Sequence, residues 1–316
     1  MDLLSDVFSR LRLRGDVYFT TDFSGRWGVQ IPSDQRTIRF HLVIHGQCWV
    51  TVDGESEPTL LKEREFALIP HGAGQRLSSS PKGNTVALEN LITTDNPDRA
   101  GVLRYSMRGS GGQCRLVCGF CRFDDEMSHP LFFGLPAMIH LNVGAVGKSP
   151  WLADAIRVTT LEANLGDPGM RSIISRLIEI LFMQGVRTQT SPSADTGNPF
   201  MLAIQDRQLR PALQAIHEQL DHDWTLSDLA GVAQMSRTQF ARRFKDVLQQ
   251  TPIQYLTNWR LQSARQLLKE SSLNVAEIAY RSGYRSLPSF SRRFKERFGV
   301  APAAYRRQSD TAETTT

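Results

Sequence analysis

The 316-residue chain is long enough for two domains, and its 41% hydrophobic content suffices for globular cores. No stretch approaches the roughly eighteen consecutive apolar residues of a membrane span, and the N-terminus lacks the apolar core of a secretion signal. The sequence therefore predicts a cytoplasmic protein without a membrane partner. The net charge is uneven: residues 224–307 carry fifteen Lys/Arg against five Asp/Glu, or +10, whereas the whole chain carries +5. Such a basic segment favours nucleic-acid binding.

The first half of the chain is predicted to be mostly β-structure. A short amphipathic helix is expected over Leu3–Leu13, followed from about residue 16 to about 145 by short alternating apolar runs. Phe40–Glu55 predicts two strands around His45-Gly46, with a closing turn at Asp53-Gly54. Many short strands with glycine-containing turns predict a β-barrel or sandwich.

Four cysteines fall in this half: Cys48, Cys114, Cys118 and Cys121. Cytosolic thiols are expected to stay reduced. In an extended strand Cys114 and Cys118 share one face about 13 Å apart, beyond the ~7 Å Cα limit for a disulfide, and Cys121 points to the other face. Cys118 and Cys121 have a zinc-like spacing but no second pair to complete four ligands. Buried cysteines acting as small hydrophobic residues are the simplest interpretation.

Helices are predicted over about 149–187. Ser149–Leu165 ends at the breaker Gly166–Gly169, and Met170–Arg187 carries a broad apolar stripe. The stripe fits packing onto the barrel and a dimer interface equally well, and its members are Ile173, Leu177, Ile180, Leu181 and Val186. Residues 188–199, without large apolar side chains, predict an interdomain linker. A lead-in helix is expected over Phe200–Leu220, and residues 308–316 predict a disordered tail.

The C-terminal part contains one construction twice, in Thr225–Tyr255 and Asn274–Tyr305. The offset between the copies is forty-nine residues at Leu229-Ala230 and fifty from Ser236 onward, so that one residue is inserted in the second turn. Each copy predicts a first helix with a capping box, a tight turn, and a second helix capped by Ser236 or Ser286. Gly283 in the second turn suits a positive φ.

The second helix of each copy is amphipathic. Phenylalanines at helical spacing predict a core face, and polar and basic side chains occupy the opposite face. The phenylalanines are Phe240 and Phe244 in the first copy, and Phe290, Phe294 and Phe298 in the second.

These C-terminal residues resemble the DNA-binding domain of AraC/XylS-family transcriptional regulators. The resemblance is carried by Gly283–Arg307 and by the intervening Tyr255–Ser271. It implies two helix-turn-helix units on one linking helix, Ile253–Leu268, each placing its second helix in the major groove of double-stranded DNA. The implied base-reading residues are Thr238, Ala241, Arg242, Pro288, Ser291 and Arg292. The implied contacts to the DNA backbone are Ser236, Arg243, Lys245, Ser286, Arg293 and Lys295.

The β-rich half resembles the cupin-type sensor domain that precedes such DNA-binding domains. The carriers are Phe40–Gly46, Leu68–Gly72, Leu116–Gly119 and Pro130–Pro136. By resemblance the barrel responds to a small-molecule or oxidant effector, and RNA polymerase and a second copy of the chain are expected partners. The resemblance suggests an activator, but the sequence leaves activation or repression, and the oligomeric state, open. Some regulators with this barrel use cysteine oxidation, which makes Cys118, Cys114 and Cys48 candidates for redox sensing.

A cupin-type metalloenzyme carrying a DNA-binding appendage is the alternative function. His41 and His45 share a strand face, but the position of the second motif histidine is Gln75, and no Glu follows His45 within four residues. Structural histidines are therefore favoured, and neither a metal nor another cofactor is predicted. A nucleoid protein is disfavoured because the base-facing helices carry specific side chains rather than uniform Lys/Arg.

The sequence thus predicts an α+β multidomain protein that acts as a sequence-specific transcriptional regulator rather than an enzyme. Residues 1–187 form a cupin-like effector and dimerisation domain, and residues 200–307 form an all-α double helix-turn-helix domain.

Overall fold

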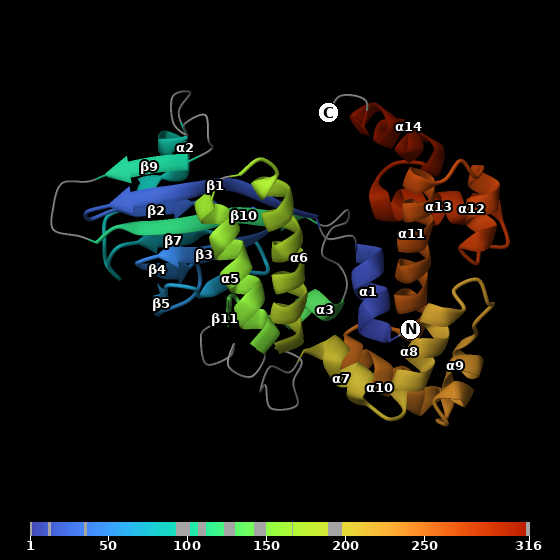
Figure 1. Ribbon diagram of the computed structural model, residues 1–316. Helices are drawn as coiled ribbons and strands as arrows, with labels where there is room; N and C mark the ends of the chain where they lie inside the picture. Colours follow the sequence, from blue (N-terminus) through green and yellow to red (C-terminus); the bar gives the residue numbers. More distant parts are fainter. Residues whose placement is uncertain are drawn as a thin grey trace. The chain divides into compact units, whose positions relative to one another are not determined.

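The computed structural model forms two compact units, one of Leu11–Asn198 and one that joins Met1–Arg10 to Pro199–Thr316 (Figure 1). The residues that the structure describes are 2–11, 14–34, 37–92, 102–106, 112–122, 130–141, 150–165, 167–188 and 198–313. The predicted linker, 188–199, lies outside them except for its ends.

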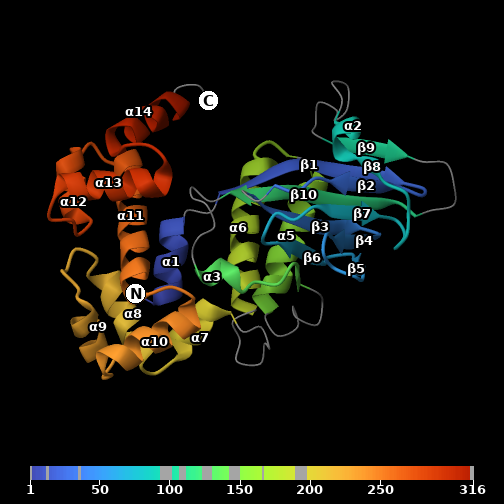
Figure 2. The ribbon, with the colours of Figure 1, turned by 180° about the vertical axis from the view of Figure 1, so that it is seen from behind.

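The unit Leu11–Asn198 is built on two facing β-sheets, visible from both sides in Figures 1 and 2. Sheet A has the strand order β11-β6-β3-β10-β1-β9, and sheet B has the order β5-β4-β7-β2-β8. The strands are β1 (Arg14–Ser24), β2 (Gly28–Ile31), β3 (Thr37–His45), β4 (Gln47–Val52), β5 (Thr59–Lys62), β6 (Phe66–Ile69), β7 (Gln75–Ser78), β8 (Val86–Ala87), β9 (Val102–Ser106), β10 (Cys114–Arg122) and β11 (Ile139–Leu141). The predicted cupin-like β-domain is confirmed.

At Gly46 the chain passes from one sheet to the other through a single residue. The two strands predicted around His45-Gly46 form as β3 and β4, but they belong to different sheets. Gly46 has φ +79°, and a Cβ there would lie 2.2 Å from the Gln113 carbonyl oxygen. Only glycine permits both the left-handed backbone and this close approach. Between the sheets lies one apolar core that includes Trp27, Val50 and Leu116.

Helix α6 covers the outer face of sheet A, with α5 beside it (Figures 1 and 2). The Gly15 N–H donates to Glu179 on α6 at 3.1 Å. The predicted stripe divides between two faces: Leu181 and Val186 are buried, whereas Ile173 and Ile180 are 44% and 39% exposed. The helices of this unit are α2 (Leu88–Leu91), α3 (Pro130–Phe133), α5 (Pro150–Leu165) and α6 (Met170–Thr188).

The second unit is all-α, as predicted. Its helices are α1 (Leu3–Leu11), α7 (Pro199–Gln205), α8 (Leu209–Glu218), α9 (Leu226–Val232), α10 (Arg237–Leu248), α11 (Pro252–Glu270), α12 (Val275–Arg281), α13 (Leu287–Phe298) and α14 (Pro302–Glu313). The prediction of one lead-in helix over Phe200–Leu220 is wrong, because the Asp206 carboxylate accepts the N–H groups of Gln208 and Leu209 and starts a second helix. The prediction of a disordered tail from residue 308 is also wrong up to Glu313, where α14 ends.

The two predicted copies have matching local structure. Thr225 and Asp228 form a full capping box on α9, and Asn274 caps α12 through the Glu277 N–H. Each turn contains a residue with positive φ, Gln234 (φ 53°) in the first copy and Gly283 (φ 78°) in the second. The N–H of the residue that follows donates a backbone hydrogen bond to the first helix of the same copy.

The cores of the two copies repeat the same aromatic contacts. Phe244 meets Tyr255 with ring centroids 5.7 Å apart, and fifty residues on Phe294 meets Tyr305 at 5.6 Å. Both pairs are edge-on, at 74° and 76°. The internal repeat of the sequence is therefore a repeat in packing.

Helix α1 belongs to the all-α unit, although the predicted boundaries place it with the barrel. His217 of α8 is the buried link: its Nδ1 lies 2.6 Å from Asp6 of α1, and its Nε2 lies 2.7 Å from the Tyr255 hydroxyl of α11. Burial raises the pKa of Tyr255 well above its usual value, with a smaller contribution from Asp6. The hydroxyl therefore keeps its proton and can donate to Nε2, which leaves the Nδ1–H to donate to Asp6.

Removal of the Asp6 carboxylate is expected to destabilise the all-α unit. Asp6→Ala leaves a buried His217 nitrogen without this partner, at a cost of about 1–3 kcal/mol. Ser9→Ala is the matched control, because Ser9 is exposed on the same helix and its hydroxyl donates to the backbone carbonyl of Asp6, so that the change leaves the Asp6 carboxylate in place. Urea unfolding of the full chain measures both variants, and equal stabilities would show that α1 is not anchored through Asp6.

Candidate nucleic-acid interface and barrel interior

Helices α10 and α13 each have one buried face and one face that is exposed to solvent. Phe240, Phe244, Phe290 and Phe294 are fully buried beneath them. The six predicted base-reading residues lie on the outward side: Ala241 and Ser291 are half-buried, and the exposed members are Thr238, Arg242, Pro288 and Arg292. The structure thus brings each predicted set of three together on one helix face.

Several basic side chains on these faces have no close ion-pair partner among the described residues. Arg242 has an 85% exposed side chain and only a long 3.9 Å contact to Asp246. In the described part of the chain, Arg292, Lys245 and Lys295 have no ion-pair partner. Exposed pairs of the Arg242–Asp246 kind contribute little stability, so these cations are available to an anionic partner.

Two of the predicted backbone contacts are already paired within the unit. Arg243 donates from Nε and a terminal nitrogen to Asp206, at 2.9 and 2.6 Å. Because Asp206 also caps the start of α8, this ion pair connects α10 to α8. A terminal nitrogen of Arg293 lies 3.3 Å from a carboxylate oxygen of Glu296 on the same helix, and both side chains are exposed.

The two predicted serines act as helix caps. The Gln239 N–H donates to the Ser236 hydroxyl at 3.3 Å, and the Ser289 N–H donates to the Ser286 hydroxyl at 3.2 Å. They thereby fix the start of each reading helix.

Arg285, the inserted residue of the second turn, was missed as a candidate by the sequence reasoning. Its guanidinium lies 2.6 Å from Asp223, and both side chains are exposed. The one-residue step in the repeat offset was the available signal.

The barrel histidines lie in opposite environments. His41 is buried, with Nδ1 3.1 Å from the Cys118 sulfur, whereas His45 is exposed beside Glu63. Burial, and to a lesser extent the charge of Arg39, lowers the pKa of His41 to about 3, and the nearby Gln75 amide opposes this shift only in part. His41 is therefore a neutral interior side chain at physiological pH.

The four cysteines are free and buried. Cys48, Cys114 and Cys118 belong to the core between the sheets, and Cys121 lies on the other face of β10, as the strand alternation predicts. Burial raises the pKa of every one of these thiols, to about 12 for Cys114. Since the thiolate is the reactive form, these cysteines are held in an unreactive state.

Among the described residues, no three His, Cys, Asp or Glu side chains are grouped so that they could hold a metal ion. None of the described helices is long and apolar enough to span a membrane.

Comparison with known proteins agrees with both units. Residues 2–191 match the family described as Cupin, and residues 229–308 match the family described as Helix-turn-helix domain. The chain is 29% identical over 310 residues to the HTH-type transcriptional regulator AlkR of Acinetobacter baylyi, covering 98% of this chain and 100% of that protein. It is 33% identical over 251 residues to the RCS-specific HTH-type transcriptional activator RclR of Escherichia coli, covering 75% and 87%.

A solved structure matches the C-terminal part. It is the DNA-binding domain of AdpA in complex with a target DNA, with 32% identity, 35% of this chain and 99% of that chain covered, and a TM-score of 0.33.

A β-rich cupin unit followed by two helix-turn-helix units on one long helix defines a DNA-binding transcriptional regulator. The chain belongs to the AraC family of these regulators, with a cupin domain at its N-terminus. The resemblance stated from the sequence is confirmed.

The buried thiols are expected to resist modification in the folded protein. A shift of the thiol pKa from about 8.5 to about 12 leaves Cys114 with on the order of a thousandfold less thiolate. Titration with 5,5′-dithiobis(2-nitrobenzoate) at pH 8 should find four slow thiols, and four fast ones in guanidinium. A thiol that reacts equally fast in both conditions would contradict the burial of that cysteine.

Proposed function

We propose that α10 and α13 read two successive major grooves on one face of operator DNA. The observation that carries the proposal is the pair of equivalent exposed basic faces supported by one helix, α11. A helix of 19 residues is about 28 Å long, close to the ~34 Å between successive major grooves on one face.

Within this arrangement Arg242 and Arg292 read bases. Both lie one turn after the first reading position of their helix, and an exposed arginine can donate two hydrogen bonds to guanine O6 and N7. Thr238, Ala241, Pro288 and Ser291 contribute shape and apolar contact. Lys245, Lys295, Arg293 and the N-termini of the helices capped by Ser236 and Ser286 contact phosphates. Arg243 contributes through its ion pair with Asp206, which orients α10.

Replacing a base-reading arginine is expected to reduce specificity as well as affinity. Arg242→Ala or Arg292→Ala should weaken operator binding about ten- to a hundredfold, from the ~1–3 kcal/mol of a bidentate guanine contact, and relax preference at one base pair. Fluorescence anisotropy with operator and scrambled DNA measures the effect.

Lys245→Ala is the matched control, because a phosphate contact weakens both DNAs alike and flattens the salt dependence. If Arg242→Ala lowers affinity for both DNAs equally, Arg242 contacts the backbone and the proposed reading face is wrong.

The operator-bound chain is proposed to act in the cytoplasm as an activator that contacts RNA polymerase. Support comes from the relative RclR, which is named a transcriptional activator. In vitro transcription with purified polymerase tests the contact. If the operator-bound chain lowers the transcript yield, the chain is a repressor rather than an activator.

The cupin unit is proposed to be an effector-binding and dimerisation domain without catalytic activity. The relatives are named transcriptional regulators, and Gln75 stands where a catalytic cupin would place a histidine. Stoichiometric iron, manganese or zinc in the purified protein would revive the metalloenzyme alternative.

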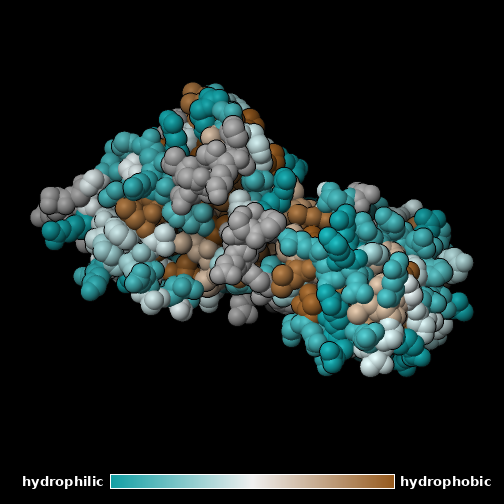
Figure 3. Space-filling view, turned by 90° about the horizontal axis from the view of Figure 1, so that it is seen from below, coloured by the Kyte–Doolittle hydropathy of each residue, from teal (hydrophilic) through white to brown (hydrophobic). Residues whose placement is uncertain are grey.

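The dimer proposal rests on an exposed apolar row along α5 and α6. Trp151, Val158 and Leu165 on α5 are seven residues apart, with Leu165 65% exposed, and Ile173 and Ile180 on α6 have the same spacing. A seven-residue repeat suits helix packing against a second copy, because a two-fold axis pairs the row with itself. Figure 3 shows one face of the protein, which is mostly hydrophilic and carries small hydrophobic patches.

A charge beside this row is expected to dissociate the dimer. Leu161→Glu, which adds a carboxylate beside Val158 on the exposed face of α5, should shift the chain to monomers in sedimentation velocity at micromolar concentration. Ala153→Glu, at an exposed position away from the row, is the control. A wild-type monomer, or a dimer that survives Leu161→Glu, would contradict this interface.

An oxidant remains a second candidate signal, favoured by the convergence of Cys48, Cys114 and Cys118 in one core. Their burial and raised pKa favour a small molecule instead. A target response to oxidant that is lost in Cys118→Ser would favour the oxidant, and a response unaltered when all four cysteines are serine would remove it.

A further inference from the structure

The open edge of the β-sandwich contains a pocket. Its volume is about 210 Å³, and all of its lining residues belong to the unit Leu11–Asn198. Strand β5 is the edge strand of sheet B and β11 is the edge strand of sheet A, so the pocket lies where the two sheets end. The mouth of a β-barrel is one of the common places for small-molecule sites.

The floor of the pocket is apolar and continues into the barrel core. Val50 and Val52 of β4 are buried members of that core, and Ala137 and Met138 pack against it from the segment before β11. Pro136 completes this side. A ligand seated here would bury apolar surface, which is the main source of favourable free energy on binding.

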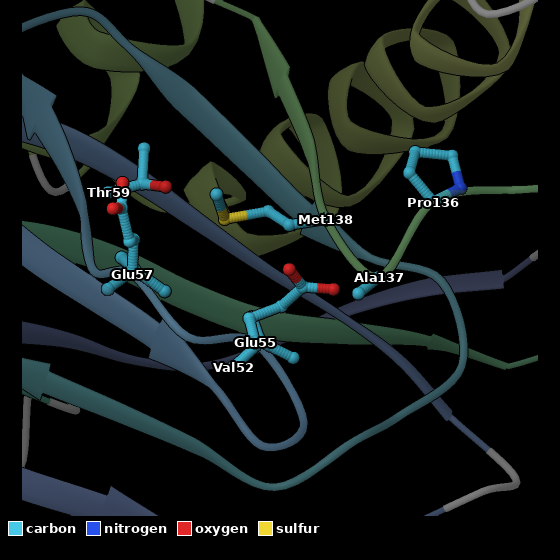
Figure 4. Close-up of a pocket in the computed structure, with 8 residues that line it drawn as sticks. Val52, Glu55, Glu57, Thr59, Pro136, Ala137 and Met138 are labelled. Carbon is cyan, nitrogen blue, oxygen red and sulfur yellow. The ribbon is translucent and has the colours of Figure 1, made fainter. Parts of the chain in front are cut away.

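The rim of the pocket is acidic. Glu55 and Glu57 lie between β4 and β5, and Figure 4 shows the Glu55 side chain extending toward the Pro136–Met138 segment. Neither carboxylate has an ion-pair partner in the part of the chain that the structure describes, and the lining contains no Lys or Arg. Two carboxylates without a protein cation next to an apolar floor complement a ligand with a positive head and an apolar body.

The interior behind the floor also has unused polar groups. Gln75 of β7 pairs in register with Val52 of β4, so both side chains lie on the same face of sheet B. Gln75 is fully buried, and neither atom of its amide has a hydrogen-bond partner among the described residues. The Gln75 amide lies close enough to His41 to raise its pKa, so the interior behind the apolar floor contains a pair of uncharged polar side chains.

We propose that this pocket binds a small organic ammonium ion, with the cation at Glu55 and Glu57 and the apolar body on Val50, Val52 and Met138. The volume excludes a drug-sized ligand, which needs about 300–1,000 Å³. The inference rests on the proposed role of the cupin unit as the effector-binding domain and supplies the chemical class of that effector.

The preference for a positively charged ligand is tested with three probes that share a cyclohexane ring and differ in charge: cyclohexylammonium, cyclohexanol and cyclohexanecarboxylate. Each is titrated into the full chain by isothermal calorimetry at low salt. Cyclohexylammonium should bind, cyclohexanol more weakly, and the carboxylate not at all. Glu55→Gln and Glu57→Gln should each weaken ammonium binding about two- to fivefold, as exposed ion pairs do, and the double variant about tenfold. Added salt should weaken binding in the wild type, less so in each single variant, and little in the double variant.

Two further variants separate the pocket from general charge. Glu63→Gln removes an exposed carboxylate of the same unit outside the pocket and should leave binding unchanged. Ala137→Leu fills the pocket and should abolish binding while the thermal unfolding midpoint shows that the chain remains folded. Equal binding of the three probes, no binding of the ammonium, or an unaffected double variant would overturn the site.

Operator binding with and without cyclohexylammonium is measured separately. A changed operator affinity that is lost in the double Gln variant supports the effector role. Binding of the ammonium with no change in operator affinity or transcription would leave the pocket in place and overturn the effector role of the cupin unit. Absence of binding would overturn the pocket alone, since DNA recognition does not depend on it.

Discussion

Helix α11 is the element on which the DNA-binding unit depends. Its first half supplies Tyr255 and Trp259 to the buried core of the first helix-turn-helix, and its second half supplies Leu261, Ala264 and Leu268 to the core of the second. Because one continuous helix belongs to both cores, the separation and rotation of α10 and α13 follow from helix geometry rather than from a flexible joint. A site that reads two grooves at a fixed spacing requires this rigidity.

The first residues of the chain add a second constraint. Through Asp6 and His217, α1 completes the buried surroundings of Tyr255, which also contacts Phe244 beneath the first reading helix. The sequence of the cupin unit therefore runs between two segments that pack in the DNA-binding unit.

The cupin unit separates two kinds of chemistry. In its interior, burial disfavours the ionised forms of His41 and of the four thiols, so His41 is neutral and the thiols stay protonated. Its open edge keeps charge, where Glu55 and Glu57 border an apolar floor. The exposed carboxylates that border the pocket are therefore separated from the buried thiols of the core.

The sequence by itself determined the local features: the repeated helix-turn-helix, the serine caps, the positive φ of Gly283 and the alternation that separates Cys121 from Cys118. Each of these depends on a few neighbouring residues, so that spacing and residue type suffice. The tertiary structure decided the docking of α1 by Asp6 and His217, the pairing of Arg243 with Asp206, the passage of the chain between sheets at Gly46, and the pocket between β5 and β11. These features join residues that are distant along the chain, and their energies depend on burial and on distances that no local pattern records.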